Sequence, residues 1–209
     1  MPVEPAILGA FIIAASALVI SPGPDTVLIV RYALSSGHRV GLAAVAGVQL
    51  GLLVHTALAV AGISLIIASS PVLFKLVALT GAAYLAWLGV QGFRGGGALG
   101  FKTGQPHVSG AKAMREAALT NLLNPKVILL FLALLPNFID TTRADVSAQL
   151  LTLATTLIII NVLWQTPLAW LAVTVRRWLI DPAISKMISR LTGGILLMFA
   201  ALMVYDNLS

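Results

Sequence analysis

The sequence contains no cysteine in its 209 residues. Disulfides, thiolate catalysis and metal sites with cysteine ligands are therefore excluded, and the redox compartment is left open. Charged residues are also scarce, at 10% of the chain against about 25% in a typical soluble domain. With a mean hydropathy of +0.99, the chain lacks the polar side chains that would cover a soluble surface. An ordinary soluble globular protein is therefore excluded.

Acidic residues are rarer than basic ones, at 7 against 13, which gives a net charge of +6. In a soluble protein, such an excess of positive charge suggests binding to nucleic acid. No basic patch with interleaved aromatic residues occurs in this sequence, so we expect no nucleic-acid partner. The sequence also lacks a nucleophile elbow, a phosphate loop, a dinucleotide fingerprint and a metal-ligand cluster. We therefore expect neither a cofactor nor a bound metal.

Apolar residues, in contrast, make up 59% of the chain. A membrane-crossing helix needs about 20 mostly apolar residues, and six stretches qualify: 6–33, 41–68, 72–92, 117–138, 148–174 and 188–206. No positive residue precedes the first stretch, so we expect a retained span rather than a signal peptide. A polar, glycine-rich stretch then divides the chain into 1–93, a loop at 94–116, and 117–209. The predicted fold is an all-α integral membrane protein surrounded by lipid.

Basic residues indicate how this protein would lie in the membrane. If all six stretches cross, ten basic residues lie on one side: Arg31, Arg39, Arg94, Lys102, Lys112, Arg115, Arg176, Arg177, Lys186 and Arg190. The other side has only Lys75 and Arg143. By the positive-inside rule the richer side is cytoplasmic, which places both termini outside a bacterial inner membrane.

Weak similarity relates the two halves of the chain. Leu79-Thr-Gly-Ala in the third stretch matches Leu191-Thr-Gly-Gly in the sixth, and the first and fourth stretches share a proline followed by a charge. Three spans is an odd number, so the second copy must cross the membrane in the opposite direction. We therefore expect two inverted three-helix repeats, an architecture that is common among secondary transporters.

Prolines interrupt the first and fourth stretches near their middles. Pro22 and Pro24, with Gly23 between them, cannot continue a regular helix. Asn124 and Pro125 are typical of the N-cap and first residue of a new helix. Such helix starts favour a carboxylate, and inversion would bring the two starts together near the bilayer centre. The alternative is a simple proline kink at each position.

Asp25 and Lys126 are the ionisable acid and base that lie well inside the predicted spans. A lone charge at the bilayer centre costs about 2.5 to 3.5 kcal/mol, so each needs a partner or a wet cavity. One interpretation pairs the two side chains with each other. In the other, Asp25 binds a cationic group, Lys126 binds an anionic group, and protonation of Asp25 couples transport to the proton gradient. Both interpretations hold if the substrate, on binding, separates Asp25 from Lys126.

A stripe of small residues in the second span predicts close contact with another helix: Ala43, Gly47 and Gly51. His55 continues this stripe and is either a packed side chain or a proton relay. Gln49 is expected to point elsewhere. Tyr84 and Trp87 in the third span either line a cavity or face lipid.

Amide side chains in the second half have two interpretations. Asn161 and Gln165 share a face of the fifth span with Trp164. They either bond to a neighbouring helix or line a polar cavity. Asn121, one turn before the break in the fourth span, has the same two interpretations.

Four motifs together carry a family resemblance: Ser21-Pro-Gly-Pro-Asp, Gly47-Val-Gln-Leu-Gly, Gly81-Ala-Ala-Tyr-Leu-Ala-Trp-Leu-Gly and Asn121-Leu-Leu-Asn-Pro-Lys. From about residue 6 onward the chain resembles the LysE/RhtB family of amino-acid exporters, and its homoserine/threonine branch more than its lysine branch. The resemblance implies efflux of a small zwitterion across the inner membrane, with protons as the coupling ion. It also implies that the family's motif positions are occupied by Pro22, Gly23, Pro24, Asp25, Asn124, Pro125 and Lys126.

The sequence thus predicts a secondary transporter for a small amino acid or derivative, and not an enzyme. A passive channel is the first alternative, because paired half-helices also occur in pores. A cation exporter is the second, although no acidic or histidine cluster supports it. An intramembrane enzyme using Asp25 and His55 lacks a nucleophile. The small-residue stripes also allow a homodimer.

Overall fold

The computed structural model describes residues 2–69, 71–94, 107–142, 145–172, 174 and 181–208. Its α-helices in chain order are α1 (Pro5–Ile20), α2 (Pro24–Ser36), α3 (His38–Ser69), α4 (Pro71–Arg94), α5 (Gly110–Leu122), α6 (Pro125–Leu129), α7 (Val146–Trp170) and α9 (Pro182–Leu208). No strand occurs in these ranges, which confirms the predicted all-α class. Four of the basic residues used to orient the chain lie outside the described residues: Lys102, Arg143, Arg176 and Arg177.

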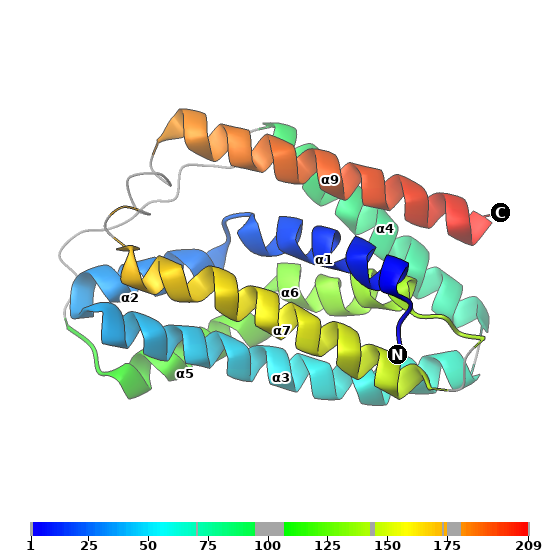
Figure 1. Cartoon of the computed structure of the whole chain (residues 1–209), viewed down its shortest axis with the longest axis horizontal. Helices are drawn as coiled ribbons and strands as arrows, with labels where there is room; N and C mark the ends of the chain where they lie inside the picture. The colour runs from blue at the N-terminus through cyan, green and yellow to red at the C-terminus, as the bar shows by residue number, and fades with distance from the viewer. Residues whose placement is uncertain are drawn as a thin grey trace.

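The helices form a bundle around the broken first segment (Figure 1). Helix α1 lies between α9 on one side and α7 on the other, and α3 packs along both α5 and α7. Helix α4 packs along α9 at the opposite edge of the bundle. The apolar core includes Phe11, Leu18, Leu134 and Leu153, all 1% exposed or less. The break between α1 and α2 therefore lies inside the bundle.

Several helices have the length and composition of membrane spans. Helix α3 over His38–Gly62 and α7 over Val146–Trp170 each qualify alone, with mean hydropathies of 1.8 and 1.9. Two bent pairs qualify together: Pro5–Ile20 with Pro24–Ser36, and Gly110–Leu122 with Lys126–Phe138. The described residues thus hold two to four candidate spans, and the six expected from hydropathy stay a prediction.

The predicted breaks are confirmed in both broken segments. Helix α1 ends at Ile20 and α2 begins at Pro24 after a bend of 54°, with Gly23 as the N-cap. The second pair bends by 58°, and Asn124 is the N-cap of α6 as its sequence indicates. Helix α5 begins at Gly110, inside the stretch expected to form a loop at 94–116.

The fourth segment is more irregular after its break than the sequence led us to expect. Only five residues of α-helix follow, and the chain then forms η1 (Leu130–Leu134), a π-helix, and η2 (Leu135–Phe138), a 3-10 turn. Pro136 lies in that turn and has no amide to donate to a preceding carbonyl. Regular α-helix in this segment thus ends at Leu129, and Pro136 lies in the final 3-10 turn.

The stripe of small residues forms the contact between α3 and α5. A Cβ atom on Gly47 would lie 2.1 Å from the backbone oxygen of Met114 and 3.0 Å from Cβ of Ala117. Gly51 is equally close to α5, because its Cβ would lie 2.4 Å from Oδ1 of Asn121. The expected role of the stripe in close helix contact is confirmed.

Gly47→Ala is expected to destabilise the protein by about 1 to 3 kcal/mol, because backbone atoms of α5 must move to admit the methyl group. Gly62→Ala is the matched control on the same helix, since its Cβ would meet nothing within 4 Å. Thermal unfolding in detergent would compare the two midpoints. Equal midpoints for both variants would contradict the contact.

Candidate functional site

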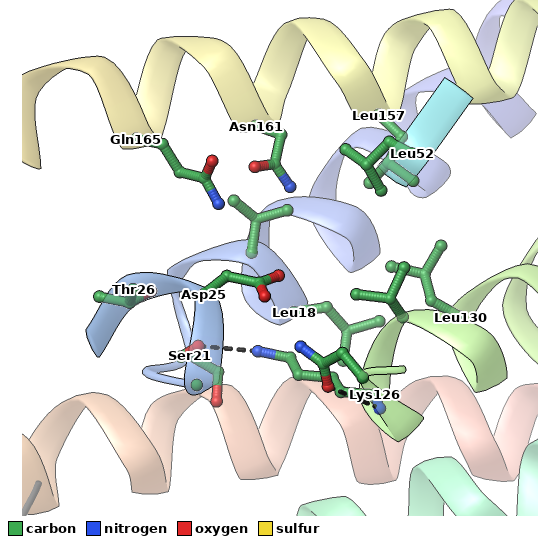
Figure 2. A pocket seen from close by; sticks show the side chains of 14 residues that line it. Leu18, Ser21, Asp25, Thr26, Leu52, Lys126, Leu130, Leu157, Asn161 and Gln165 are labelled. Atoms are coloured by element: carbon green, nitrogen blue, oxygen red, sulfur yellow. Dashed lines mark hydrogen bonds between the residues drawn. The ribbon is translucent and has the colours of Figure 1, made fainter. Parts of the chain in front are cut away.

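The two helix breaks meet at one place in the bundle. At the break after α1, the carbonyl of Ser21 is bonded to a side chain: Nζ of Lys126 donates a 2.7 Å hydrogen bond to it (Figure 2). At the other break, the side-chain oxygen of Asn124 accepts a 3.1 Å bond from the backbone amide of Lys126. Lys126 therefore joins the start of α6 to the end of α1.

Asp25 is the second residue of α2, and its side chain is 8% exposed. The side-chain amide of Asn121 donates a 2.8 Å hydrogen bond to its Oδ2. Its Oδ1 is buried and has no hydrogen-bond partner in the described structure. One carboxylate oxygen of Asp25 is thus fixed by α5, and the other is available to a donor.

Two amides of α7 face the same region (Figure 2). Asn161 and Gln165 are buried, and Oδ1 of Asn161 has no partner in the described structure. Oε1 of Gln165 accepts a 3.2 Å bond from Nε2 of Gln49 on α3. In Figure 2, Asp25 lies between these amides and Lys126.

A cavity of about 40 Å³ lies at the centre of these groups, and we name it the head-group cavity. Its polar lining comes from Ser21, Asp25, Thr26, Asn124, Lys126, Asn161 and Gln165. Leucine side chains close one side of it: Leu18, Leu52, Leu130 and Leu157. One buried water needs about 10 to 15 Å³, so the cavity holds about three waters. It fits a small charged group and not a whole amino acid.

Asp25 and Lys126 form no direct ion pair in the described structure, so the interpretation that they pair directly does not hold in this conformation. Asp25 bonds to Asn121, and Lys126 bonds to the carbonyl of Ser21. Among the described residues, the side-chain ion pairs join Glu116 to Arg31 at 3.9 Å and to Lys112 at 3.8 Å. The acid and the base thus face one cavity without a direct ion pair between them.

His55 lies behind this cavity and not in its wall. Its Nε2 is 3.4 Å from the backbone oxygen of Asn121, and its ring stacks on Phe131 with centroids 5.4 Å apart. It lines a separate, mostly apolar cavity of about 340 Å³ together with Leu58 and Leu132. The geometry favours the packed histidine over the proton relay.

Under the sequence's prediction of proton-coupled transport, His55→Gln is therefore expected to leave the transport rate close to that of the wild type. The amide can still donate to the backbone oxygen of Asn121, and losing a neutral hydrogen bond costs only about 0.5 to 1.5 kcal/mol. Substrate flux under an imposed pH gradient is the measurement. If the variant lost flux driven by the pH gradient but kept substrate exchange, the result would support the interpretation of His55 as a proton relay.

Gln49 points away from the small-residue stripe, as expected: the stripe contacts α5, whereas Gln49 bonds to Gln165 on α7. The sequence reasoning did not name that partner, although an amide inside a span needs one. Tyr84 and Trp87 had two interpretations, and both line a cavity of about 300 Å³ beside the break.

Pro22 and Pro24 line this larger cavity as well. Pro125 is the first residue of α6 and positions Lys126 behind it. Asn121 stands between Asp25 and His55 and contacts both. The structure therefore brings the predicted break residues and amides together, with His55 one layer behind them.

Comparison with known proteins is consistent with this architecture. The family described as "LysE type translocator" matches residues 16–207 of the chain. A protein of Vibrio cholerae named "Uncharacterized membrane protein" is 37% identical over 185 residues, which cover 88% of this chain and 90% of the relative. No solved structure matches the chain.

Two relatives with functional names are similar over nearly the whole chain. The "Homoserine/homoserine lactone efflux protein" of Salmonella typhi is 31% identical over 93% of this chain and 94% of its own length. The "Leucine efflux protein" of an Enterobacter species is 30% identical over 91% of this chain and 92% of its own. With its long apolar helices, the chain is a multi-pass membrane protein. The match over residues 16–207 shows that it belongs to the LysE family of translocators.

Proposed function

We propose that this protein exports a small amino acid, or a close derivative, across the bacterial inner membrane in exchange for protons. The observation that carries the proposal is the head-group cavity, where a buried acid with a free oxygen and a lysine face one space. An amino acid has an ammonium group and a carboxylate a few atoms apart, and it needs one contact of each sign. Asp25 and Lys126 supply those two contacts.

The free acceptors define where the ammonium group binds. Oδ1 of Asp25 and Oδ1 of Asn161 are both buried and lack donors. An unpaired buried acceptor costs about 1 to 3 kcal/mol, and an ammonium group has three donors to offer. The ammonium end of the substrate therefore satisfies the two oxygens when it enters the cavity.

The carboxylate end binds to Lys126 in place of the Ser21 carbonyl. Nζ of Lys126 now donates to that neutral oxygen at 2.7 Å, and a carboxylate is the stronger acceptor. A neutral carbonyl also serves Lys126, so an ester or lactone is compatible with the site. This range agrees with the homoserine lactone and leucine in the names of the two relatives.

Proton exchange follows from competition for one carboxylate. Asp25 is buried, so after the substrate ammonium leaves it is stabilised by taking up a proton. Release of that proton on the cytoplasmic side would restore the charge that attracts the next substrate. Substrate and proton thus occupy Asp25 in turn, which is the requirement for antiport.

The proposal includes six spans in two inverted repeats, 1–93 and 117–209, with the 94–116 stretch cytoplasmic and both termini outside. Two pairings support this arrangement: α3 packs along α7, and α4 packs along α9. Each pair joins corresponding helices of the two halves, as expected where such helices lie next to a two-fold axis in the membrane plane.

Counterflow in proteoliposomes tests the function, with labelled threonine, homoserine, leucine, lysine and arginine as candidates. The proposal predicts saturable uptake of label into vesicles preloaded with the same unlabelled amino acid. A channel would let label equilibrate without such exchange, and that result would contradict the proposal. So would the absence of flux for every amino acid with folded protein in the bilayer.

A further inference from the structure

A second cavity adjoins the head-group cavity and is much larger, at about 300 Å³. It lies between the α1–α2 break and the pair α4 and α9, and we name it the α4–α9 chamber. One face of α4 contributes Tyr84, Trp87 and Gln91, and one face of α9 contributes Ser189, Thr192 and Leu196. The positions on each helix are spaced by three and four residues, so each set shares one helical face.

Close contact between α4 and α9 forms the wall of the chamber. A Cβ atom on Gly193 would lie 2.6 Å from the backbone oxygen of Gly89, so the two backbones nearly touch there. The rings of Tyr84 and Trp87 stack one turn apart, with centroids 5.4 Å apart and planes 25° apart. Thr192 is 5% exposed and fixed within the pair. The chamber therefore has a defined wall of packed helices.

The two cavities share part of their lining, including Ser21, Gly23, Asn124 and Lys126. The side chain of Lys126, bonded to Ser21, thus stands between them. The head-group cavity holds about three waters, whereas ligand pockets begin at about 300 Å³. A bound amino acid fits only if its charged end reaches the small cavity and its side chain occupies the chamber.

The charge of the chamber distinguishes between classes of side chain. Among the described residues that line it, Lys126 is the charged group, and no Asp or Glu is present. The other polar groups are uncharged and suit neutral side chains: Ser21 and Asn124 at the breaks, and Tyr84, Gln91, Ser189 and Thr192 on α4 and α9. A lysine or arginine side chain would enter without a counter-charge and near a cation, which is costly in a partly buried space.

We infer that the α4–α9 chamber is the side-chain subsite of the transporter and that it selects neutral amino acids over lysine and arginine. This inference rests on the proposed function, because it needs an amino acid held at Asp25 and Lys126. It adds the residues that determine specificity: Tyr84, Trp87, Gln91, Ser189 and Thr192. Adding one negative charge to the chamber wall should then admit a cationic side chain.

Gln91→Glu tests this with nearly no change of shape, at a position whose side chain is exposed and tolerates a charge. Ser189→Asp adds the same charge from α9, the opposite wall. Ala111→Glu is the control, because it adds a carboxylate at an exposed position in the first turn of α5, outside the chamber. Counterflow of labelled leucine and lysine in proteoliposomes gives kcat/KM for each variant.

The wild-type protein should favour leucine over lysine by about tenfold or more, because a cationic side chain in the chamber lies near Lys126 without a counter-charge. Gln91→Glu and Ser189→Asp should each raise the lysine-to-leucine ratio about tenfold, and Ala111→Glu should leave it unchanged. A wild-type protein that moves lysine as well as leucine would overturn the inference. An unchanged lysine-to-leucine ratio in both chamber variants would also overturn the inference. The proposed function would still stand in that case, provided that the wild type exchanges leucine. If the wild type exchanged no amino acid at all, the proposed function itself would fail.

Discussion

Asp25→Asn is expected to abolish proton-driven export while the protein stays folded. Asparagine has nearly the same shape as aspartate and still accepts the bond from Asn121, but it cannot ionise. It therefore neither releases a proton nor supplies the charge that binds the substrate ammonium. Loss of a charged hydrogen bond costs about 1.5 to 3 kcal/mol, so the substrate exchange that remains without a pH gradient should also fall by about ten- to a hundredfold. Substrate accumulation under an imposed pH gradient is the measurement.

Asp181→Asn is the matched control for this variant. Asp181 is exposed and its carboxylate accepts bonds from the backbone amides of Ala183 and Ile184, which asparagine can also accept. The control should transport like the wild type, since it removes the same charge at a residue that lines neither cavity. A folded Asp25→Asn protein that still accumulates substrate in response to the gradient would show that another group carries the proton.

Lys126→Ala is expected to weaken substrate binding, raising the apparent KM by about ten- to a hundredfold. The variant removes the cation that would bind the carboxylate, and a charged hydrogen bond is worth about 1.5 to 3 kcal/mol. It also leaves the Ser21 carbonyl without the partner that it has in this conformation. Concentration dependence of counterflow gives KM, and thermal unfolding reports the effect on stability separately.

Lys112→Ala serves as the control for the loss of a positive charge. Lys112 pairs with Glu116 at 3.8 Å on an exposed part of α5, and exposed pairs contribute about 0.2 to 1 kcal/mol. Its KM should match that of the wild type. An unchanged KM in Lys126→Ala as well would remove Lys126 from the binding site, whatever its effect on stability.

The breaks and the charged residues beside them were predictable from the sequence. The effect of proline on the backbone is local, so Pro22-Gly23-Pro24 and Asn124-Pro125 indicate the helix ends that the structure shows there. Likewise, Asp25 and Lys126 could be singled out because a charged side chain inside an apolar membrane span is energetically costly. Local sequence therefore predicted which residues form the candidate site.

The partners of those residues were not predictable, because they depend on how separate helices pack. Asn121 reaches Asp25 because Gly51 leaves room for it, a fit of two helices that neither segment shows alone. The partner of Gln49 was not predicted for the same reason, since Gln165 lies 116 residues away. The α4–α9 chamber is likewise a space between helices, and Tyr84 and Trp87 could not be assigned to it from spacing.

The measurement that tests the account most directly is proton movement during substrate export from proteoliposomes. Vesicles would hold a pH-sensitive dye and a neutral amino acid, and dilution would start outward flux through the wild-type protein. The account predicts that the lumen becomes more acidic as the amino acid leaves, because protons enter in exchange at Asp25. Amino-acid efflux with no change in luminal pH, or with the lumen becoming more alkaline, would contradict exchange for protons.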